Sequence, residues 1–133
     1  MKTDLTVLSD AELVERFNEL ALQLGSLCED FETRSYNRRL PHMRAVSDEL
    51  FHRGKLDALL PGMQNENLWI QYYSAVHCRS IAPAENLAVL ERLAKLFKQG
   101  PLAYPGSVAG EAWTSLNILR SGHAIERTRP PRE

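Results

Sequence analysis

The sequence lacks most of the features that identify a function. Its two cysteines, Cys28 and Cys78, form no CxxC pair and no Cys/His cluster, so we expect two buried thiols in a reducing compartment, with a disulfide or metal role as the alternative. No apolar run approaches the roughly 18 residues of a membrane span. The first segment, MKTDLTVLSDAEL, also lacks the continuous apolar stretch of a secretory signal. We therefore expect a cytoplasmic protein without a membrane span.

Charge of one sign and strand periodicity are also missing. The net charge is −1, which gives no global attraction to nucleic acid or to an anionic membrane. No segment alternates polar and apolar residues as a strand does, and so no glycine-rich phosphate loop follows a strand. We expect no cofactor. A hydrophobic content of 44% in 133 residues suits one globular domain that buries its own core.

Helical periodicity is what the sequence contains. Ser9 and Glu12 form a capping box, and apolar residues then recur at three- and four-residue steps, which predicts a helix from Ser9 to about Thr33 that includes Phe31 in its apolar stripe. Gly25 lies within this helix and indicates a close crossing with another helix. The sequence thus begins with an amphipathic helix of about six turns.

A second helix is predicted from about Ser35 to Arg53. Gly54 is suited to stop it, whereas Pro41 should kink the helix or delay its start, because proline lacks a backbone donor. The remaining expected elements are a short helical turn at 55–60, a helix at 67–81, a helix that begins at Pro83 and a last helix at about 108–120.

The helix at 67–81 is the most informative of these. It carries one formal charge, Arg79, and Asn67 is suited to cap its start. A surface helix needs a charged face, so a helix with almost none is usually covered on more than one side. The sequence therefore predicts a central helix with the other helices stacked around it.

This part of the chain resembles a known repeat. The segment LLPGMQNENLWIQYYSAVHCRSIAPAENLAVLERLAKLF is similar to a HEAT-type repeat, with Asn67 at the Asx cap of the second helix and Ile70-Gln71 where that family has a Val-Arg pair. With LSDAELVERFNELA and GEAWTSL added, the chain resembles a family of short bacterial helical proteins of unknown function. The resemblance implies an all-α, HEAT-like stack of five to six helices without a sheet, and it implies no activity. We expect one helical domain at 1–122 and a disordered tail at 123–133.

Charge is distributed unevenly along the first two helices. Residues 1–32 hold two basic and eight acidic residues, whereas residues 33–55 hold six basic and two acidic residues. One interpretation is an antiparallel hairpin whose flanks attract each other. The other is that Glu12, Glu15 and Glu19, which share one side of a helix, form a surface for a basic partner; we call these three residues the acidic ridge.

Candidate catalytic and metal-binding patterns are sparse. Glu49 and His52 have the Glu-x-x-His spacing of a di-iron ligand pair, but no second copy is present, so we expect no metal. His77 and Cys78 are adjacent and point about 100° apart on a helix, so they do not form a nucleophile–base pair by themselves. The basic cluster at 34–39 is short and lacks interleaved exposed aromatic residues, and the three arginines of the tail surround two prolines, as in a solvated end. Nucleic acid is therefore an unlikely partner.

Trp69, Tyr73 and His77 follow one another at four-residue spacing on the central helix. Such residues serve either as core or as part of a partner or ligand groove, since Trp and Tyr bury a large area and keep a polar tip. Our leading hypothesis is a non-enzymatic protein-binding module, an inhibitor or immunity-type protein that masks another, possibly basic, protein. The alternatives are a ligand-binding or enzymatic domain with a pocket near the central aromatics, and a structural subunit such as a homodimer.

Overall fold

The computed structural model describes residues 4–98 and 100–120, and in this part every regular element is a helix. The five α-helices are α1 (Asp10–Glu29), α2 (Thr33–His52), α3 (Leu68–His77), α4 (Pro83–Ala94) and α5 (Val108–Arg120). Three 3-10 helices accompany them: η1 (Leu5–Val7), η2 (Leu56–Gln64) and η3 (Lys95–Phe97). The predicted all-α architecture of stacked helices is confirmed. The tail predicted at 123–133, and the end of the domain predicted at 122, lie outside the described residues.

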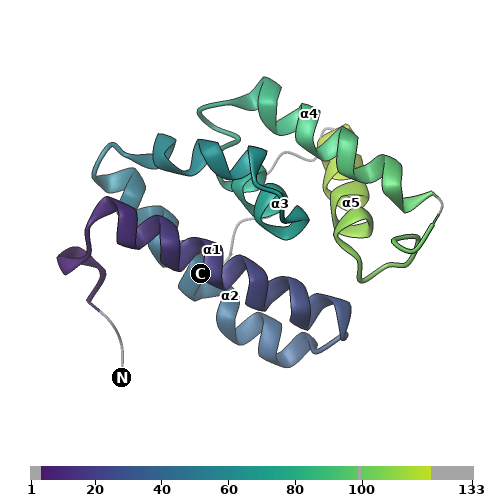
Figure 1. Ribbon diagram of the computed structural model, residues 1–133, viewed down its shortest axis with the longest axis horizontal. Coiled ribbons are helices and arrows are strands. Elements are labelled where there is room, and N and C mark those ends of the chain that lie inside the picture. Colours follow the sequence, from purple (N-terminus) through teal and green to yellow (C-terminus); the bar gives the residue numbers. More distant parts are fainter. Residues whose placement is uncertain (1–3, 99, 121–133) are drawn as a thin grey trace.

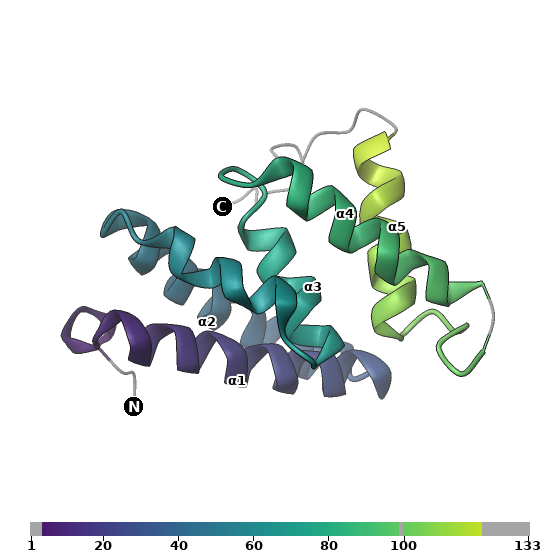
Figure 2. The same cartoon turned by 45° about the horizontal axis from the view of Figure 1, so that its top comes forward.

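The helices are stacked in sequence order with α3 in the middle. α1 and α2 lie side by side as a hairpin, α4 and α5 form a second packed pair, and α3 lies between the two pairs (Figures 1 and 2). α3 contacts η2, α1, α4 and α5. This position confirms that the helix with almost no charge is covered on several sides.

The start of α1 agrees with the sequence and its end does not. Ser9 Oγ accepts from the Glu12 N–H at 3.1 Å, and Glu12 Oε1 accepts from the Ser9 N–H at 2.8 Å, which confirms the capping box. The helix ends at Glu29, and Phe31 adopts a left-handed φ of 57°. The Glu32 N–H donates to the Leu27 carbonyl at 2.9 Å, as in a Schellman ending.

This ending removes Phe31 from the apolar stripe of α1, to which we had assigned it. Its side chain is 65% exposed. A left-handed backbone costs a non-glycine residue roughly 1–2 kcal/mol, so the chain places a bulky aromatic residue where glycine is the usual choice. The turn lets α2 begin at Thr33 and pack back against α1.

α2 passes through Pro41 without a break. It begins at Thr33, so the prediction that Pro41 delays its start is wrong. Its end is as predicted: Gly54 has φ 71°, its N–H donates to the Phe51 carbonyl, and the Lys55 N–H donates to the Leu50 carbonyl at 2.8 Å. Glycine at this position avoids the steric cost that Phe31 carries in the equivalent place after α1.

The middle of the chain contains less α-helix than predicted. η2 extends the expected turn to Gln64 and runs through Pro61, and α3 ends at His77 although we expected it to reach Ile81. Pro83 acts on the end of the following turn, since a residue that precedes proline is disfavoured in the α conformation. Ala82 accordingly has φ −145° and ψ 62°, which turns the chain before α4.

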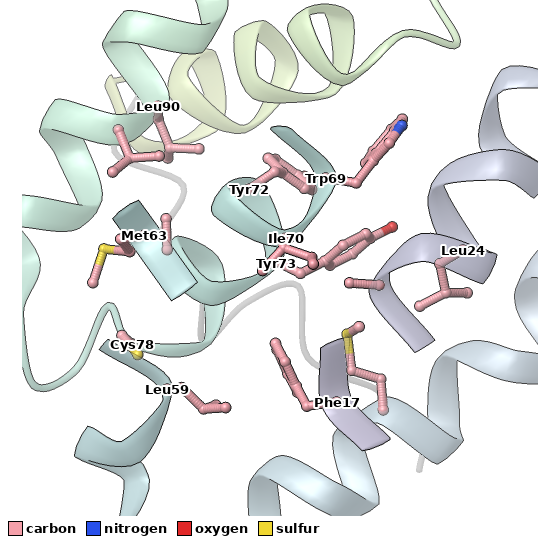
Figure 3. Packing of buried hydrophobic residues seen from close by; sticks show 14 of the residues in the cluster. Phe17, Leu24, Leu59, Met63, Trp69, Ile70, Tyr72, Tyr73, Cys78 and Leu90 are labelled. Carbon is pink, nitrogen blue, oxygen red and sulfur yellow. The ribbon is translucent and has the colours of Figure 1, made fainter. Parts of the chain in front are cut away.

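The predicted close crossing at Gly25 is the contact between α1 and α3. A Cβ atom added at Gly25 would overlap the indole ring of Trp69. Trp69 is 6% exposed and lies in the core with Leu24 and Tyr73 (Figure 3). Glycine is therefore required here for space, because its backbone is helical and would suit any good helix former.

We predict that Gly25→Ala lowers the free energy of unfolding by about 1–3 kcal/mol, because the added methyl group overpacks the crossing. The matched control is Ser26→Ala, an exposed substitution at the next position of the same helix. Urea unfolding of both variants measures the difference. Alanine has a higher helix propensity than glycine or serine, so without the crossing neither substitution should destabilise the protein. Equal stability of the two variants would therefore contradict the crossing.

Candidate functional site

The acidic ridge lies on the exposed face of α1. Glu12, Glu15 and Glu19 are all exposed, while Leu13, Phe17 and Leu20 face the core. The carboxylate of Glu12 is engaged in the capping box. Within residues 4–98 and 100–120, neither Glu15 nor Glu19 forms an ion pair. The ridge is thus open, and two of its three carboxylates form no ion pair with the described residues.

The hairpin interpretation of the opposite charges is confirmed in its geometry. α1 and α2 are antiparallel, since Arg53 Nη1 lies 3.0 Å from Asp10 Oδ1 and Arg39 Nη1 donates to Gln23 Oε1 at 3.1 Å. Arg53 also binds Glu49 and the carbonyl of Leu5, which ties η1 to the end of α2. The ion pair between the helices is therefore at one end of the hairpin and leaves Glu15 and Glu19 to solvent.

The aromatic residues that we considered for partner binding are core residues. Trp69 and Tyr73 are 6% and 4% exposed, and their rings stack with centroids 5.9 Å apart. The Tyr73 hydroxyl is hydrogen-bonded to Tyr36 at 2.9 Å, and Trp69 Nε1 donates to Glu29 Oε2 at 2.7 Å. The prediction of an open aromatic surface is corrected, because α1 covers this face of α3. The structure does not join these residues to the acidic ridge.

His77 is half-buried beneath α1. Its ring meets Phe17 edge to face with centroids 5.1 Å apart. Burial lowers the pKa of His77 to about 4, and the positive charge of Arg44 acts in the same direction. The imidazole is therefore neutral at pH 7 and functions as an aromatic packing residue.

The other patterns with catalytic or metal-binding spacing are occupied locally. Glu49 pairs with Arg53, and His52 Nδ1 lies 2.8 Å from the carbonyl of Asp48. Cys78 is buried, which raises the pKa of its thiol to about 11. In the described part of the chain, no group of three or more His, Cys, Asp or Glu side chains is placed to hold a metal ion.

A pocket of about 310 Å³ opens where the α1–α2 turn meets the loop before α5. We call it the corner pocket. Ten residues line it: Leu27, Cys28, Phe31, Glu32, Thr33, Tyr36, Asn37, Pro105, Gly106 and Glu111. It adjoins the central aromatics through the hydrogen bond between Tyr36 and Tyr73.

The loop before α5 is held closely against α1. A Cβ atom at Gly106 would lie 2.7 Å from the Cys28 carbonyl oxygen and 3.0 Å from the Phe31 ring. Ser107 fixes the loop, since its hydroxyl donates to the Leu102 carbonyl at 2.7 Å and accepts from the Gly110 N–H at 3.0 Å. The backbone of this loop therefore forms a fixed wall of the corner pocket. Glu111, in the first turn of α5, projects from a fixed position beside it.

The titratable groups of the pocket are perturbed by burial. Burial, and then the charge and hydrogen bond of Glu111, raise the pKa of the Cys28 thiol to about 12. Burial also raises the pKa of Glu111, while the hydrogen bond with Cys28 opposes that shift. Burial raises the pKa of Tyr36. At pH 7 the thiol is protonated, and a protonated thiol is a poor nucleophile.

A second groove of about 380 Å³ lies between η2 and α4. Its walls are mostly apolar, with Met63, Ile81 and Val89 among them, and Glu85 and Arg92 are its charged residues. Arg92 Nη2 donates to Gln71 Oε1 at 2.7 Å, so this guanidinium already has a partner on α3.

The corner pocket was missed by reasoning from the sequence. We had assigned Phe31 to the apolar stripe of the first helix and Cys28 to the core, and Glu111 had not been singled out. The available signal was the Gly- and Pro-rich loop at 100–107, which lies directly before a helix with an acidic residue, Glu111, in its first turn. Nothing in the spacing brings that loop to the end of α1, because 70 or more residues of stacked helices intervene.

Comparisons with known proteins give one informative match. No model of a known protein family matches the sequence, and no curated protein matches it. The fold is similar to the crystal structure of the protein RPA1889 from Rhodopseudomonas palustris, with a TM-score of 0.75 and 25% sequence identity over 92% of this chain and 98% of that one. The name of that bacterial protein states no activity or ligand. The match supports the small all-helical fold over nearly the full length of both chains.

No helix in the described residues is both long enough and apolar enough to span a bilayer.

We predict that His77 makes stability depend on pH. Its folded pKa of about 4 is below its ordinary value of 6.5, so below pH 6.5 the unfolded chain binds a proton that the folded chain does not. The free energy of unfolding should therefore fall as the pH drops from 6.5 towards 4, by on the order of 1–3 kcal/mol in total. Urea unfolding between pH 7 and pH 4.5 measures it. His77→Phe should flatten this dependence and His42→Phe, at an exposed site, should not; equal slopes in both would contradict the assignment.

We also predict that Cys28 is slow to alkylate in the folded protein. With its pKa raised to about 12, the reactive thiolate is scarce at pH 8, so iodoacetamide should modify Cys28 at least about tenfold more slowly in the native protein than in urea. Mass spectrometry of the Cys28 peptide gives both rates. Equal rates would show a thiol that is neither buried nor suppressed by Glu111.

Proposed function

We propose that this chain is a non-enzymatic protein-binding module that masks a basic partner protein in the cytoplasm, in the manner of an inhibitor or immunity protein. The observation that carries the proposal is the open acidic ridge on α1. Glu15 and Glu19 are exposed and form no ion pair among the described residues, although the basic helix α2 packs beside them. Charges that stabilised the hairpin would be expected to pair across it.

The physical role of such a ridge is recognition. Unpaired charges on one face raise the rate of encounter with an oppositely charged surface and select against acidic partners. They add little to the stability of the free protein, since exposed charges at four-residue spacing on a helix repel one another. A ridge of this kind is therefore useful mainly when a partner covers it.

The stacked helices supply the rigid support that such a surface needs. We interpret η2–α3 and α4 as a HEAT-like unit, in keeping with the sequence resemblance, with the α1–α2 hairpin stacked on one side of it. Helical stacks of this type present extended surfaces whose curvature follows from the rotation between neighbouring units. The α1–α2 hairpin lies at one side of the stack (Figure 2), and the exposed side chains of the acidic ridge belong to its first helix, where a partner has access to them.

The corner pocket favours a second candidate function, the binding of a small molecule. It adjoins the central aromatic helix through Tyr36 and Tyr73, where the alternative hypothesis expected a pocket. Native mass spectrometry of protein purified from its natural source would support this function if it showed a bound compound in the wild type that is missing from the Tyr36→Phe variant. A mass equal to that of the chain alone would leave the protein-binding proposal as the preferred one.

The proposal predicts a partner that depends on the ridge. Tagged protein should capture one stoichiometric protein from native lysate at about 50 mM salt and lose most of it at about 500 mM, because salt screens exposed charges. The double variant Glu15→Lys/Glu19→Lys should capture at least about tenfold less of this partner than the wild type does.

The matched control is Glu66→Lys/Glu85→Lys, which changes the net charge equally at exposed positions outside α1. It should capture the partner as the wild type does. Equal capture by the ridge variant and this control would contradict the proposal. A self-associated dimer in size-exclusion chromatography, with no other protein bound, would favour the structural-subunit hypothesis instead.

A further inference from the structure

We propose that the corner pocket receives a single lysine or arginine side chain from the partner protein. The inference rests on the proposed function and names a second, separate contact for the same partner. The pocket combines one half-buried carboxyl group, an exposed aromatic ring and apolar lining residues, at the opposite end of α1 from Asp10 and Arg53.

The size of the pocket restricts what enters it. Pockets for complete small-molecule ligands occupy about 300–1,000 Å³, so a pocket of about 310 Å³ is at the lower limit of that range. One long side chain suits such a volume better than a folded segment or a cofactor. Leu27 and Pro105 are apolar residues of its lining, and they suit the apolar stem of lysine or arginine.

The charged end of that side chain has a specific acceptor in Glu111. This carboxyl group is half-buried, and among residues with described positions it forms no ion pair. Its neighbour is the Cys28 thiol, which is a weak donor. A half-buried carboxylate with only a weak donor is under-compensated, and an entering ammonium or guanidinium group would supply the missing charge.

The surroundings of Glu111 are acidic on balance. Glu32 lines the same opening, and Glu29 and Asp30 are close enough to act on Tyr104 beside it. One positive charge, that of Arg44, acts on Tyr36 from α2. An anion would thus meet two carboxylates, Glu32 and Glu111, in the lining of the pocket, whereas a cation is attracted by them.

Phe31 provides the remaining contact. Phe31 is 65% exposed. Its burial in the free protein therefore offsets little of the free energy that its left-handed backbone conformation costs. Residues held in sparsely populated conformations are found preferentially at ligand clamps and switch regions. An exposed aromatic face at the edge of an acidic pocket attracts lysine and arginine through cation–π contact.

The test is an NMR titration of the isotope-labelled full chain with a defined probe. The probe is the capped tripeptide Ala-Arg-Ala, and its neutral isostere Ala-citrulline-Ala is the matched ligand control. The arginine peptide should cause saturable amide shifts at Phe31, Asn37, Gly106 and Glu111, with an affinity at least about tenfold above that of the citrulline peptide.

Two variants locate the interaction. Glu111→Gln should weaken the arginine peptide at least about tenfold, while Glu66→Gln, an exposed carboxylate outside the pocket, should bind it as the wild type does. Phe31→Gly should also weaken binding, although glycine relieves the left-handed backbone and the variant should unfold at the same urea concentration or a higher one. A loss of affinity in a protein that is at least as stable cannot be a folding defect.

Each failure has a distinct meaning. Equal affinity for the citrulline peptide, or shifts confined to Glu15 and Glu19, would overturn the corner pocket as a cation site and leave the acidic ridge untouched. Shifts caused by free agmatine but not by the peptide would overturn a partner side chain as the occupant. Pocket shifts that persist in Glu15→Lys/Glu19→Lys, when that variant still captures the partner, would support the pocket and contradict the ridge.

Discussion

The structure depends on the burial of one short helix, α3. It is covered by α1 on one side and by η2, α4 and α5 on others, and its three aromatic residues, Trp69, Tyr72 and Tyr73, are all buried. Trp69 can approach α1 only because Gly25 has no side chain. Large aromatic residues bury about 150–250 Å² each, so three of them within five positions dominate the core energetics of a domain this small. The two outer helix pairs are held together through α3.

Burying these residues requires partners for their polar atoms, and the outer helices supply them. Tyr73 binds Tyr36 on α2, Tyr72 binds Ser115 on α5 at 2.9 Å, and Trp69 binds Glu29 on α1. A buried hydroxyl without a partner costs about 1–3 kcal/mol, so these bonds also fix which helix lies against which face. The exception in the described residues is Ser74 Oγ, which is buried without a partner where η2 approaches at Gly62.

Local features of this fold could be predicted from the sequence, and long-range placement could not. The capping box at Ser9, the stop at Gly54 and the crossing at Gly25 depend on neighbouring residues or on the space that glycine leaves. Helix ends that depend on backbone conformation, as at Phe31, carry no glycine signal. The acidic ridge followed from helical spacing, whereas the corner pocket joins residues from α1, α2 and α5 that only the stacking brings together.

The buried helix α3 and the exposed surfaces have different roles in this account. If the aromatics of α3 are the structural centre, recognition is left to the surfaces of α1 and of the corner pocket, and α3 should be the most protected helix. Native-state hydrogen exchange of the full chain tests this claim most directly. The account predicts that the amides of Tyr72 to Ala75 exchange only through global unfolding, with an opening free energy equal to that from urea unfolding. Exchange of these amides through local opening, faster than those of α1, would contradict it.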